Sequence, residues 1–208
     1  RKDKEYYVRG TYTALNKDFS QDVIHMSNLG IKNISVEPVS SDERFKYSLS
    51  DKDLDLLDRQ YDKIAQEYIK RKGTDKEFLF FHFNIDINSS PCVYKKISGC
   101  GAGTDYMAVS PDGKLYPCHQ FDSIEEFYIG NVFDGIINKE IGQDFFSANI
   151  LTKEECKNCW AKYHCGGGCY AAGYKANSDI HKNDNLACEM LKKRLEYALM
   201  IKVIQSKS

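Results

Sequence analysis

Cysteines gather towards the end of this sequence and constrain the fold more than any other feature. The stretch from Cys156 to Cys188 holds five of the eight cysteines, with the spacing C-x2-C-x5-C-x3-C-x18-C. Thiolates packed this densely need a common partner, and a soft metal centre supplies one. A CxxC pair such as Cys156 and Cys159 brings two thiolates to one metal from a tight turn. The spacing therefore predicts a metal-binding region.

Three consecutive glycines, Gly166 to Gly168, separate Cys165 from Cys169. Glycine lets the backbone approach a bulky centre closely, and successive N–H groups then point towards anionic sulfurs. An iron–sulfur cluster with four thiolate ligands is anionic, so such donors stabilise it. The glycine run therefore favours an iron–sulfur cluster over other uses of the thiolates.

Composition and charge exclude several classes of partner. The net charge of −1 gives no bulk field that favours nucleic acid or an anionic membrane. The sequence shows no signal peptide and no apolar run of about 18 residues, so we expect a cytoplasmic protein with no membrane partner. In that compartment cysteines are metal ligands more often than disulfides.

Residues 1–77 contain no cysteine and predict alternating strands and helices. The aromatic and β-branched segments predict strands, and the apolar residues at helical spacing predict helices. The expected elements are a strand over 6–14, a helix after Asp18, a strand over 31–39 and a helix from Ser50 to Gly73. This order is typical of a parallel α/β layer.

Residues 78–208 contain all the cysteines and predict a second, α+β domain. A strand is expected over 78–87, loops and strand ends over 120–150, and a closing helix from Met190 to Gln205. Residues 106–118 predict a β-hairpin, because Ser110-Pro111-Asp112-Gly113 is a turn sequence. The change in composition near residue 78 predicts a domain boundary there.

The full cysteine frame resembles a known domain. It reads Cys100-x12-Gly113-x4-Cys118, then Cys156-x2-Cys159-x5-Cys165-x3-Cys169, and finally Cys188. This closely resembles the SPASM domain, the C-terminal module of radical S-adenosylmethionine (SAM) enzymes that modify peptides and proteins. All seven cysteines of that motif and its glycine are present. The resemblance implies that residues 1–77 are the last β/α units of the partial (β/α) barrel that carries SAM.

A narrower resemblance concerns the activity. The strand YYVRGTYT, residues 6–13, and the sequence through Cys188 look most like the maturases of SCIFF peptides, which carry six cysteines in forty-five residues. Those enzymes are associated with thioether crosslinks between a peptide cysteine and another residue's backbone carbon. The resemblance implies a cysteine-rich precursor peptide as substrate and an external electron donor such as a ferredoxin or flavodoxin.

The resemblance also implies two auxiliary [4Fe–4S] clusters and their ligands. One cluster takes Cys156, Cys159, Cys165 and Cys188, and the other takes Cys100, Cys118 and Cys169. Cys92 is the one remaining cysteine for the fourth position of the second cluster. If Cys92 does not reach it, one iron is open to a substrate thiolate.

One departure from the family pattern limits what this chain can do alone. The CxxxCxxC motif that binds the SAM cluster is absent, since Cys165-x3-Cys169 is followed by Ala172. SAM and a third [4Fe–4S] cluster would then be bound by a preceding N-terminal part of the same enzyme. We expect this chain to be the C-terminal fragment and to be inactive without that part.

Two further residues are site candidates. In the sulfatase-maturing relatives an Asp after the cysteine that corresponds to Cys118 is proposed as the substrate base. His119 occupies that position and is either a proton acceptor or a hairpin-end histidine bonded to backbone. Arg9, on the first expected strand, either meets SAM or forms a structural salt bridge.

Two other functional classes compete with the enzyme. A ferredoxin-like electron-transfer module would use the same clusters without catalysis of its own. A zinc-stabilised peptide-binding domain would use the cysteines for folding, although zinc prefers two close ligand pairs and only Cys156 and Cys159 form a CxxC.

Overall fold

The computed structural model describes residues 6–42, 44–86 and 96–206. These residues fall into two compact units, unit 1 within Arg1–Ser89 and Cys188–Ser208, and unit 2 within Ser90–Ala187. The domain boundary expected near residue 78 stays a prediction. None of the described helices combines the length and apolarity needed to cross a lipid bilayer.

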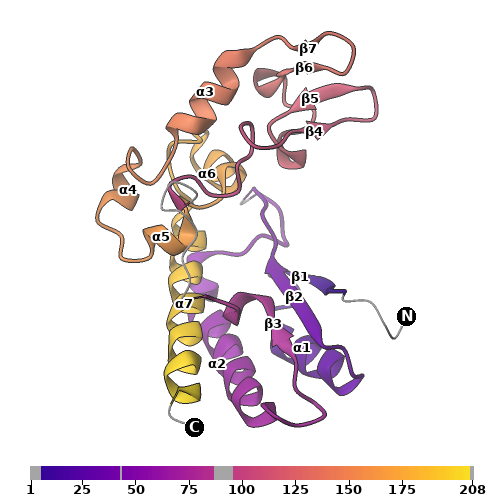
Figure 1. The fold of residues 1–208 in the computed structure, drawn as a ribbon, viewed down its shortest axis with the longest axis vertical. Coiled ribbons are helices and arrows are strands. Elements are labelled where there is room, and N and C mark those ends of the chain that lie inside the picture. Colours follow the sequence, from indigo (N-terminus) through magenta and orange to yellow (C-terminus); the bar gives the residue numbers. More distant parts are fainter. Residues whose placement is uncertain (1–5, 43, 87–95, 207–208) are drawn as a thin grey trace. The chain divides into compact units, whose positions relative to one another are not determined.

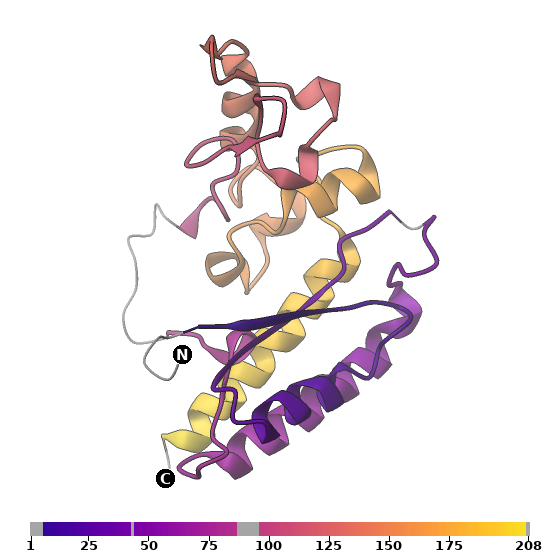
Figure 2. The same ribbon diagram turned by 90° about the vertical axis from the view of Figure 1, so that its right-hand side faces the viewer.

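Unit 1 contains a parallel sheet, as expected. Its strands are β1 (Val8–Tyr12), β2 (Asn33–Pro38) and β3 (Leu79–Phe80), in the order β1-β2-β3. Ile34 of β2 pairs with Val8 on one side and with Phe80 on the other. Parallel neighbours need crossover connections, and α1 (Phe19–Asn28) and α2 (Leu54–Arg71) supply them. Both helices lie together against one face of the sheet (Figures 1 and 2).

The helices of unit 1 begin and end where local chemistry requires. Ser50 and Asp53 form a capping box at the 3₁₀ turn Asp51–Asp53, which leads into α2. Gly73 follows α2 with a φ of 74°, a left-handed conformation that glycine adopts without strain. The core between helices and sheet is built from apolar and aromatic side chains, which include Tyr12, Phe19, Ile34, Leu57, Tyr61, Ile64 and Phe80.

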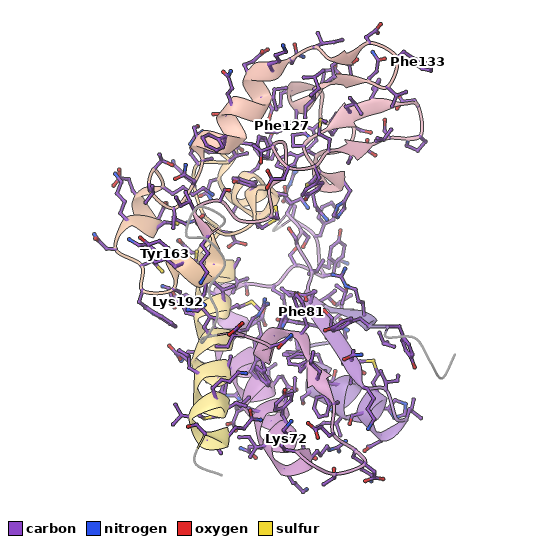
Figure 3. All side chains as sticks on the ribbon, in the orientation of Figure 1. Lys72, Phe81, Phe127, Phe133, Tyr163 and Lys192 are labelled. Atoms are coloured by element: carbon purple, nitrogen blue, oxygen red, sulfur yellow. The ribbon has the colours of Figure 1, made fainter. Side chains whose placement is uncertain are left out.

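The prediction of a strand over 78–87 is wrong for most of these residues. Only Leu79 and Phe80 pair with β2, and Phe81–Phe83 form a 3₁₀ turn. The turn buries both His82 and Phe83, which an extended strand would point to opposite faces. Phe81 remains 54% exposed (Figure 3). Residue 87 lies outside the described residues.

The last helix, α7 (Asn185–Gln205), confirms the expected closing helix and begins five residues before Met190. Its part within unit 1 runs beside α2 (Figure 1). Arg194 of α7 donates from Nε to the Tyr61 hydroxyl at 2.8 Å, and the Tyr197 hydroxyl donates to the Asp58 carbonyl at 3.3 Å. These polar contacts tie α7 to α2.

A chain of hydrogen-bonded polar groups links Arg194 through the buried side chains of Tyr61 and His82 to Glu37. The Tyr61 hydroxyl lies 3.0 Å from His82 Nδ1, and His82 Nε2 lies 2.7 Å from Glu37 Oε2. Because a carboxylate only accepts, His82 donates from Nε2 and accepts the Tyr61 proton at Nδ1. Burial, followed by the positive charge of Arg194, lowers the pKa of His82 to about 4, so the ring is neutral at pH 7.

This neutral histidine predicts acid sensitivity of unit 1. Between the ordinary pKa of 6.5 and the folded-state value of about 4, the unfolded chain binds a proton at His82 that the folded chain does not. Stability is therefore fully present above pH 6.5 and falls as the pH drops to 4, by about 3 kcal/mol at most. Urea unfolding at pH 7.5 and 4.5 measures the loss. His82→Gln, which cannot be protonated, should remove most of this pH dependence; an equal dependence in both proteins would contradict the assignment.

Unit 2 contains a four-stranded antiparallel sheet in the order β4-β5-β6-β7. The strands are β4 (Ala108–Val109), β5 (Lys114–Tyr116), β6 (Gly130–Asn131) and β7 (Gly135–Ile136). The hairpin expected over 106–118 is confirmed, and Gly113 closes its turn with a φ of 84°. A second hairpin joins β6 to β7 where strand ends were expected, and Phe133 at its tip is 89% exposed (Figure 3).

The described residues of unit 2 also form the helices α3 (Lys139–Ser147), α4 (Glu154–Lys157), α5 (Lys162–Cys165) and α6 (Tyr170–Asn177). The prediction of loops and strand ends over 120–150 is wrong where the chain forms α3. Phe145 of this helix is buried in the core. Phe145 packs with Phe121 and Phe127, at ring-centroid distances of 5.3 and 5.8 Å. This aromatic core supports the segments that carry the cysteines.

Candidate iron–sulfur centres

The first cysteine centre of unit 2 contains Cys156, Cys159 and Cys165. Cys156 is buried on α4, Cys159 follows in the turn after that helix, and Cys165 is the last residue of α5. Burial raises the pKa of the Cys165 thiol, the N–H groups of Gly167 and Gly168 oppose the rise, and the thiols of Cys156 and Cys159 add to it. The fold thus brings together three of the four cysteines that the family resemblance assigns to one cluster.

The glycine run adopts a backbone that other residues rarely adopt. Gly166, Gly167 and Gly168 have φ values of 71°, 97° and 76°. These left-handed conformations aim the N–H groups of Gly167 and Gly168 at the sulfur of Cys165. The expectation that this run directs backbone donors to sulfur is confirmed. A Cβ on Gly166 would lie 2.7 Å from the Cα of Gly99, so the run also packs directly on the backbone before Cys100.

The second centre contains Cys100, Cys118 and Cys169. Burial raises the pKa of the Cys118 thiol, the Gln120 N–H opposes the rise, and Cys169 and Cys100 add to it. The Gln120 N–H donates to Cys118 Sγ at 3.4 Å, and the Tyr106 hydroxyl donates to Cys100 Sγ at 3.9 Å. These three thiols come from different elements: the loop before β4, the end of the β5 hairpin, and the residue before α6.

Two predicted ligands are not placed in these centres by the structure. Cys92 lies outside the described residues. Cys188, the fourth residue of α7, belongs to unit 1 and is half-buried. Their assignment as fourth ligands stays a prediction.

The donor set of each centre, thiols with N–H groups that donate to sulfur, has the chemistry that an iron–sulfur cluster requires. Among the described residues, no three Cys, His, Asp or Glu side chains converge closely enough to hold one metal ion. A cubane cluster binds each thiolate at a different iron, so its ligands need not meet at a single point. Each centre also supplies N–H donors to sulfur, which stabilise an anionic cluster.

Two buried residues next to the first centre were not predicted. Asn183 donates from Nδ2 to Cys156 Sγ at 3.0 Å. Lys153 is 1% exposed, and its Nζ donates to Asn183 Oδ1 at 3.2 Å and to the Gly167 carbonyl at 3.1 Å. Lysine and asparagine are common on surfaces, so nothing in the sequence distinguishes these two.

His119 and Arg9 are both exposed. His119 begins the 3₁₀ turn His119–Phe121 after β5, and its Nε2 lies 3.1 Å from the side-chain nitrogen of Gln120. The structure therefore places His119 next to Cys118 with a side-chain partner rather than the expected backbone partner. No ion pair joins Arg9 of β1 to any described carboxylate.

Comparison with known proteins decides the class of this site. Residues 100–160 match the SPASM family, described as an iron–sulfur cluster-binding domain. The chain contains a SPASM domain. The hairpin β4–β5, Cys100, Cys118, Cys156 and Cys159 lie within the matched SPASM segment. The resemblance drawn from the cysteine frame is thereby confirmed at the level of the domain.

Two curated relatives share about half of this chain. An uncharacterized protein of Archaeoglobus fulgidus is 36% identical over 102 residues, which are 47% of this chain and 24% of that protein. The antilisterial bacteriocin subtilosin biosynthesis protein AlbA of Bacillus subtilis is 32% identical over 100 residues, 45% of this chain and 22% of AlbA. The matches thus span about a quarter of each relative's length.

Solved structures share the fold over nearly the whole chain. Native anSMEcpe with bound AdoMet and the Kp18Cys peptide superposes with a TM-score of 0.69 at 18% identity, over 98% of this chain and 58% of that one. Streptococcus suis SuiB bound to S-adenosylmethionine superposes with a TM-score of 0.53 at 19% identity, over 88% of this chain and 45% of SuiB. These likenesses confirm the expected α/β fold with its SPASM domain.

Proposed function

We propose that this chain is the auxiliary-cluster portion of a radical SAM enzyme that closes thioether bonds in a ribosomally synthesised, cysteine-rich peptide. The two thiol centres of the SPASM domain carry the proposal, because each combines three cysteines with N–H donors to sulfur. The peptide substrate is supported by AlbA, a bacteriocin biosynthesis protein, and by the peptide bound to anSMEcpe. SAM and the third cluster belong to the part of the enzyme that carries CxxxCxxC.

The residues of the two centres have distinct roles in this proposal. Cys156, Cys159, Cys165 and Cys188 would hold one [4Fe–4S] cluster with all four irons ligated. Cys100, Cys118 and Cys169 would hold the other, and its fourth position would be filled by Cys92 or by a substrate thiolate. When bound, these clusters supply one-electron redox chemistry and a binding position for sulfur.

The chemistry of the product requires an oxidation of the peptide. A thioether between a cysteine sulfur and a backbone carbon forms as one S–H and one C–H bond break, so the peptide loses two hydrogen atoms. When bound and cleaved to methionine by one electron from the external donor, SAM would supply an adenosyl group that accepts one hydrogen atom, and the other hydrogen would leave as a proton. The electron that remains passes to an acceptor in the enzyme or to its ferredoxin- or flavodoxin-like partner.

Mass spectrometry tests this function directly. The full-length enzyme, reconstituted anaerobically, is incubated with SAM, a chemical reductant and the cysteine-rich peptide encoded nearest to its gene. The proposal predicts a product lighter by two hydrogen atoms per crosslink, with fragment ions that place the bridge at a cysteine sulfur. Peptide oxidation without loss of a cysteine thiol would contradict thioether formation.

His119 supplies a second prediction for the same assay. Its Nε2 lies 3.1 Å from the Gln120 side-chain nitrogen, which can only donate, so this ring nitrogen presents a lone pair in the residue next to Cys118. If His119 accepts the peptide proton, His119→Ala is expected to lower peptide turnover by about 10²-fold or more. Its iron content should match wild type, since the side chain is exposed. Unchanged turnover would assign His119 to a structural role at the end of the hairpin.

A further inference from the structure

The side chain of Lys153 is buried inside the SPASM domain beside the first cysteine centre. It precedes α4 and is 1% exposed, although a buried ammonium loses its hydration. Its Nζ contacts the Gly167 carbonyl and Asn183 Oδ1, and it lies 5.1 Å from the centre of the Tyr170 ring. The fold therefore buries the side-chain ammonium of Lys153 beside the first cysteine centre.

Two amides that accept from Lys153 also donate an N–H to a cysteine sulfur of the first centre. The Asn183 amide accepts from Lys153 at Oδ1 and donates from Nδ2 to Cys156 Sγ at 3.0 Å. The peptide between Gly167 and Gly168 accepts from Lys153 at its carbonyl and donates its N–H to the sulfur of Cys165. A cation at the oxygen of an amide polarises it and strengthens donation from its nitrogen.

This arrangement also fixes the orientation of the Asn183 side chain. An amide turned by 180° would place its NH₂ group against the ammonium and its oxygen against sulfur, so that neither contact could form. The lysine thus determines which end of the amide faces Cys156. Both the amide and the glycine run are held in their sulfur-directed positions by one charged group.

We propose that Lys153 is a positioning residue that tunes the cluster of the first centre through the two amides. The inference rests on the proposed cluster at Cys156, Cys159 and Cys165. A positive charge nearby and stronger hydrogen bonds to sulfur stabilise the reduced cluster, which carries one more electron. Lys153 therefore raises the reduction potential of this cluster, because the two amides that it polarises donate to Cys156 and Cys165.

Redox titration monitored by electron paramagnetic resonance tests the proposal on the reconstituted full-length protein. Iron and acid-labile sulfide are counted in the same samples. Lys153→Met removes the charge and retains similar length, whereas Lys153→Arg retains the charge. Asn183→Leu removes one polarised amide and leaves Lys153 in place. Lys157→Met is the matched control, because Lys157 follows Cys156 directly, carries the same charge and is 46% exposed in its side chain.

At the wild-type midpoint of the affected cluster, Lys153→Met should lower the reduced-to-oxidised ratio at least tenfold, which is 59 mV for a one-electron couple. Asn183→Leu should lower the reduced-to-oxidised ratio by a smaller factor. Lys153→Arg, which keeps the charge, should retain most of the wild-type ratio. Lys157→Met should change it less than twofold, since solvent screens an exposed charge. The other cluster should keep its midpoint in every variant.

Three outcomes separate this inference from the function on which it rests. Unchanged midpoints in Lys153→Met and Asn183→Leu, with wild-type iron content, would overturn the tuning role. Equal loss of iron from Lys153→Met and Lys153→Arg would also overturn it, because shape rather than charge would then matter. Wild-type protein that binds no iron and sulfide would instead refute the cluster-binding function itself.

Discussion

Replacing Gly166 with alanine is expected to destabilise the SPASM domain by about 3 kcal/mol. Two costs combine at this position. Gly166 has a φ of 71°, where a side chain is strained, and its added Cβ would lie 2.7 Å from the Gly99 Cα. The Gly99 backbone cannot move without shifting Cys100, and the glycine run cannot move without misdirecting the N–H groups that face Cys165.

Gly73 provides a matched control for this substitution. It has nearly the same φ, 74°, but a Cβ there would meet nothing within 4 Å. Gly73→Ala should therefore cost only about 1 kcal/mol, from backbone strain alone. Urea unfolding gives the stability of each variant, and iron per chain after reconstitution gives its cluster content. Equal stability and equal iron in the two variants would show that close packing of Gly166 on Gly99 is unimportant.

Replacing Arg194 with methionine is expected to destabilise unit 1 by about 3 kcal/mol. The Arg194 side chain is 13% exposed, donates to the Tyr61 hydroxyl at 2.8 Å and lies 4.0 Å from the Glu37 carboxylate, whose side chain is 27% exposed. Its loss leaves the Glu37 carboxylate without its cation and removes one of the polar contacts that tie α7 to α2. Removing one partner of a buried charge pair costs more than the pair contributes, because the remaining charge stays desolvated.

The neighbouring Lys193 is the control for Arg194. Lys193 pairs with Glu196 on the surface of α7 at 3.1 Å, and its side chain is 46% exposed. Lys193→Met should change stability by less than about 0.5 kcal/mol, as surface ion pairs contribute little. The measurement is the urea midpoint at pH 7.5. A loss in Arg194→Met no larger than in Lys193→Met would contradict the structural role of the buried network.

Much of unit 1 could be predicted because local signals and packing agree there. The apolar spacing around Tyr61 and Ile64, with Ser50 and Asp53 ahead of it, predicts a helix, and α2 has this core face and this capping box. The turn before Gly113 was equally clear, because its residue types match its backbone.

The failures arose where tertiary contacts override local preference. The aromatic segment from Phe78 favours a strand, yet the chain leaves the sheet after Phe80, and the following 3₁₀ turn lets His82 reach Glu37 and Tyr61. Such contacts join residues up to 45 positions apart in the sequence, so no local pattern could indicate them. The same holds for the tie from Arg194 to Tyr61, which spans 133 positions.

At the cysteine site too, features set by local sequence could be predicted and features set by tertiary contacts could not. Spacing predicted the thiol groups and the direction of the glycine N–H groups towards sulfur, because both depend on segments that are continuous in the chain. Lys153 and Asn183 lie 30 positions apart, and only folding brings them together beside Cys156. Their residue types carry no signal of burial, so the electrostatic support of the centre became visible only in three dimensions.

Counting iron, acid-labile sulfide and zinc in anaerobically prepared full-length protein tests the central claim most directly. Two [4Fe–4S] clusters in the SPASM domain require about eight iron and eight sulfide per chain, in addition to those of the SAM cluster. We expect that content, with no stoichiometric zinc. Stoichiometric zinc without sulfide after anaerobic reconstitution would contradict the account and leave a zinc-stabilised binding domain in its place.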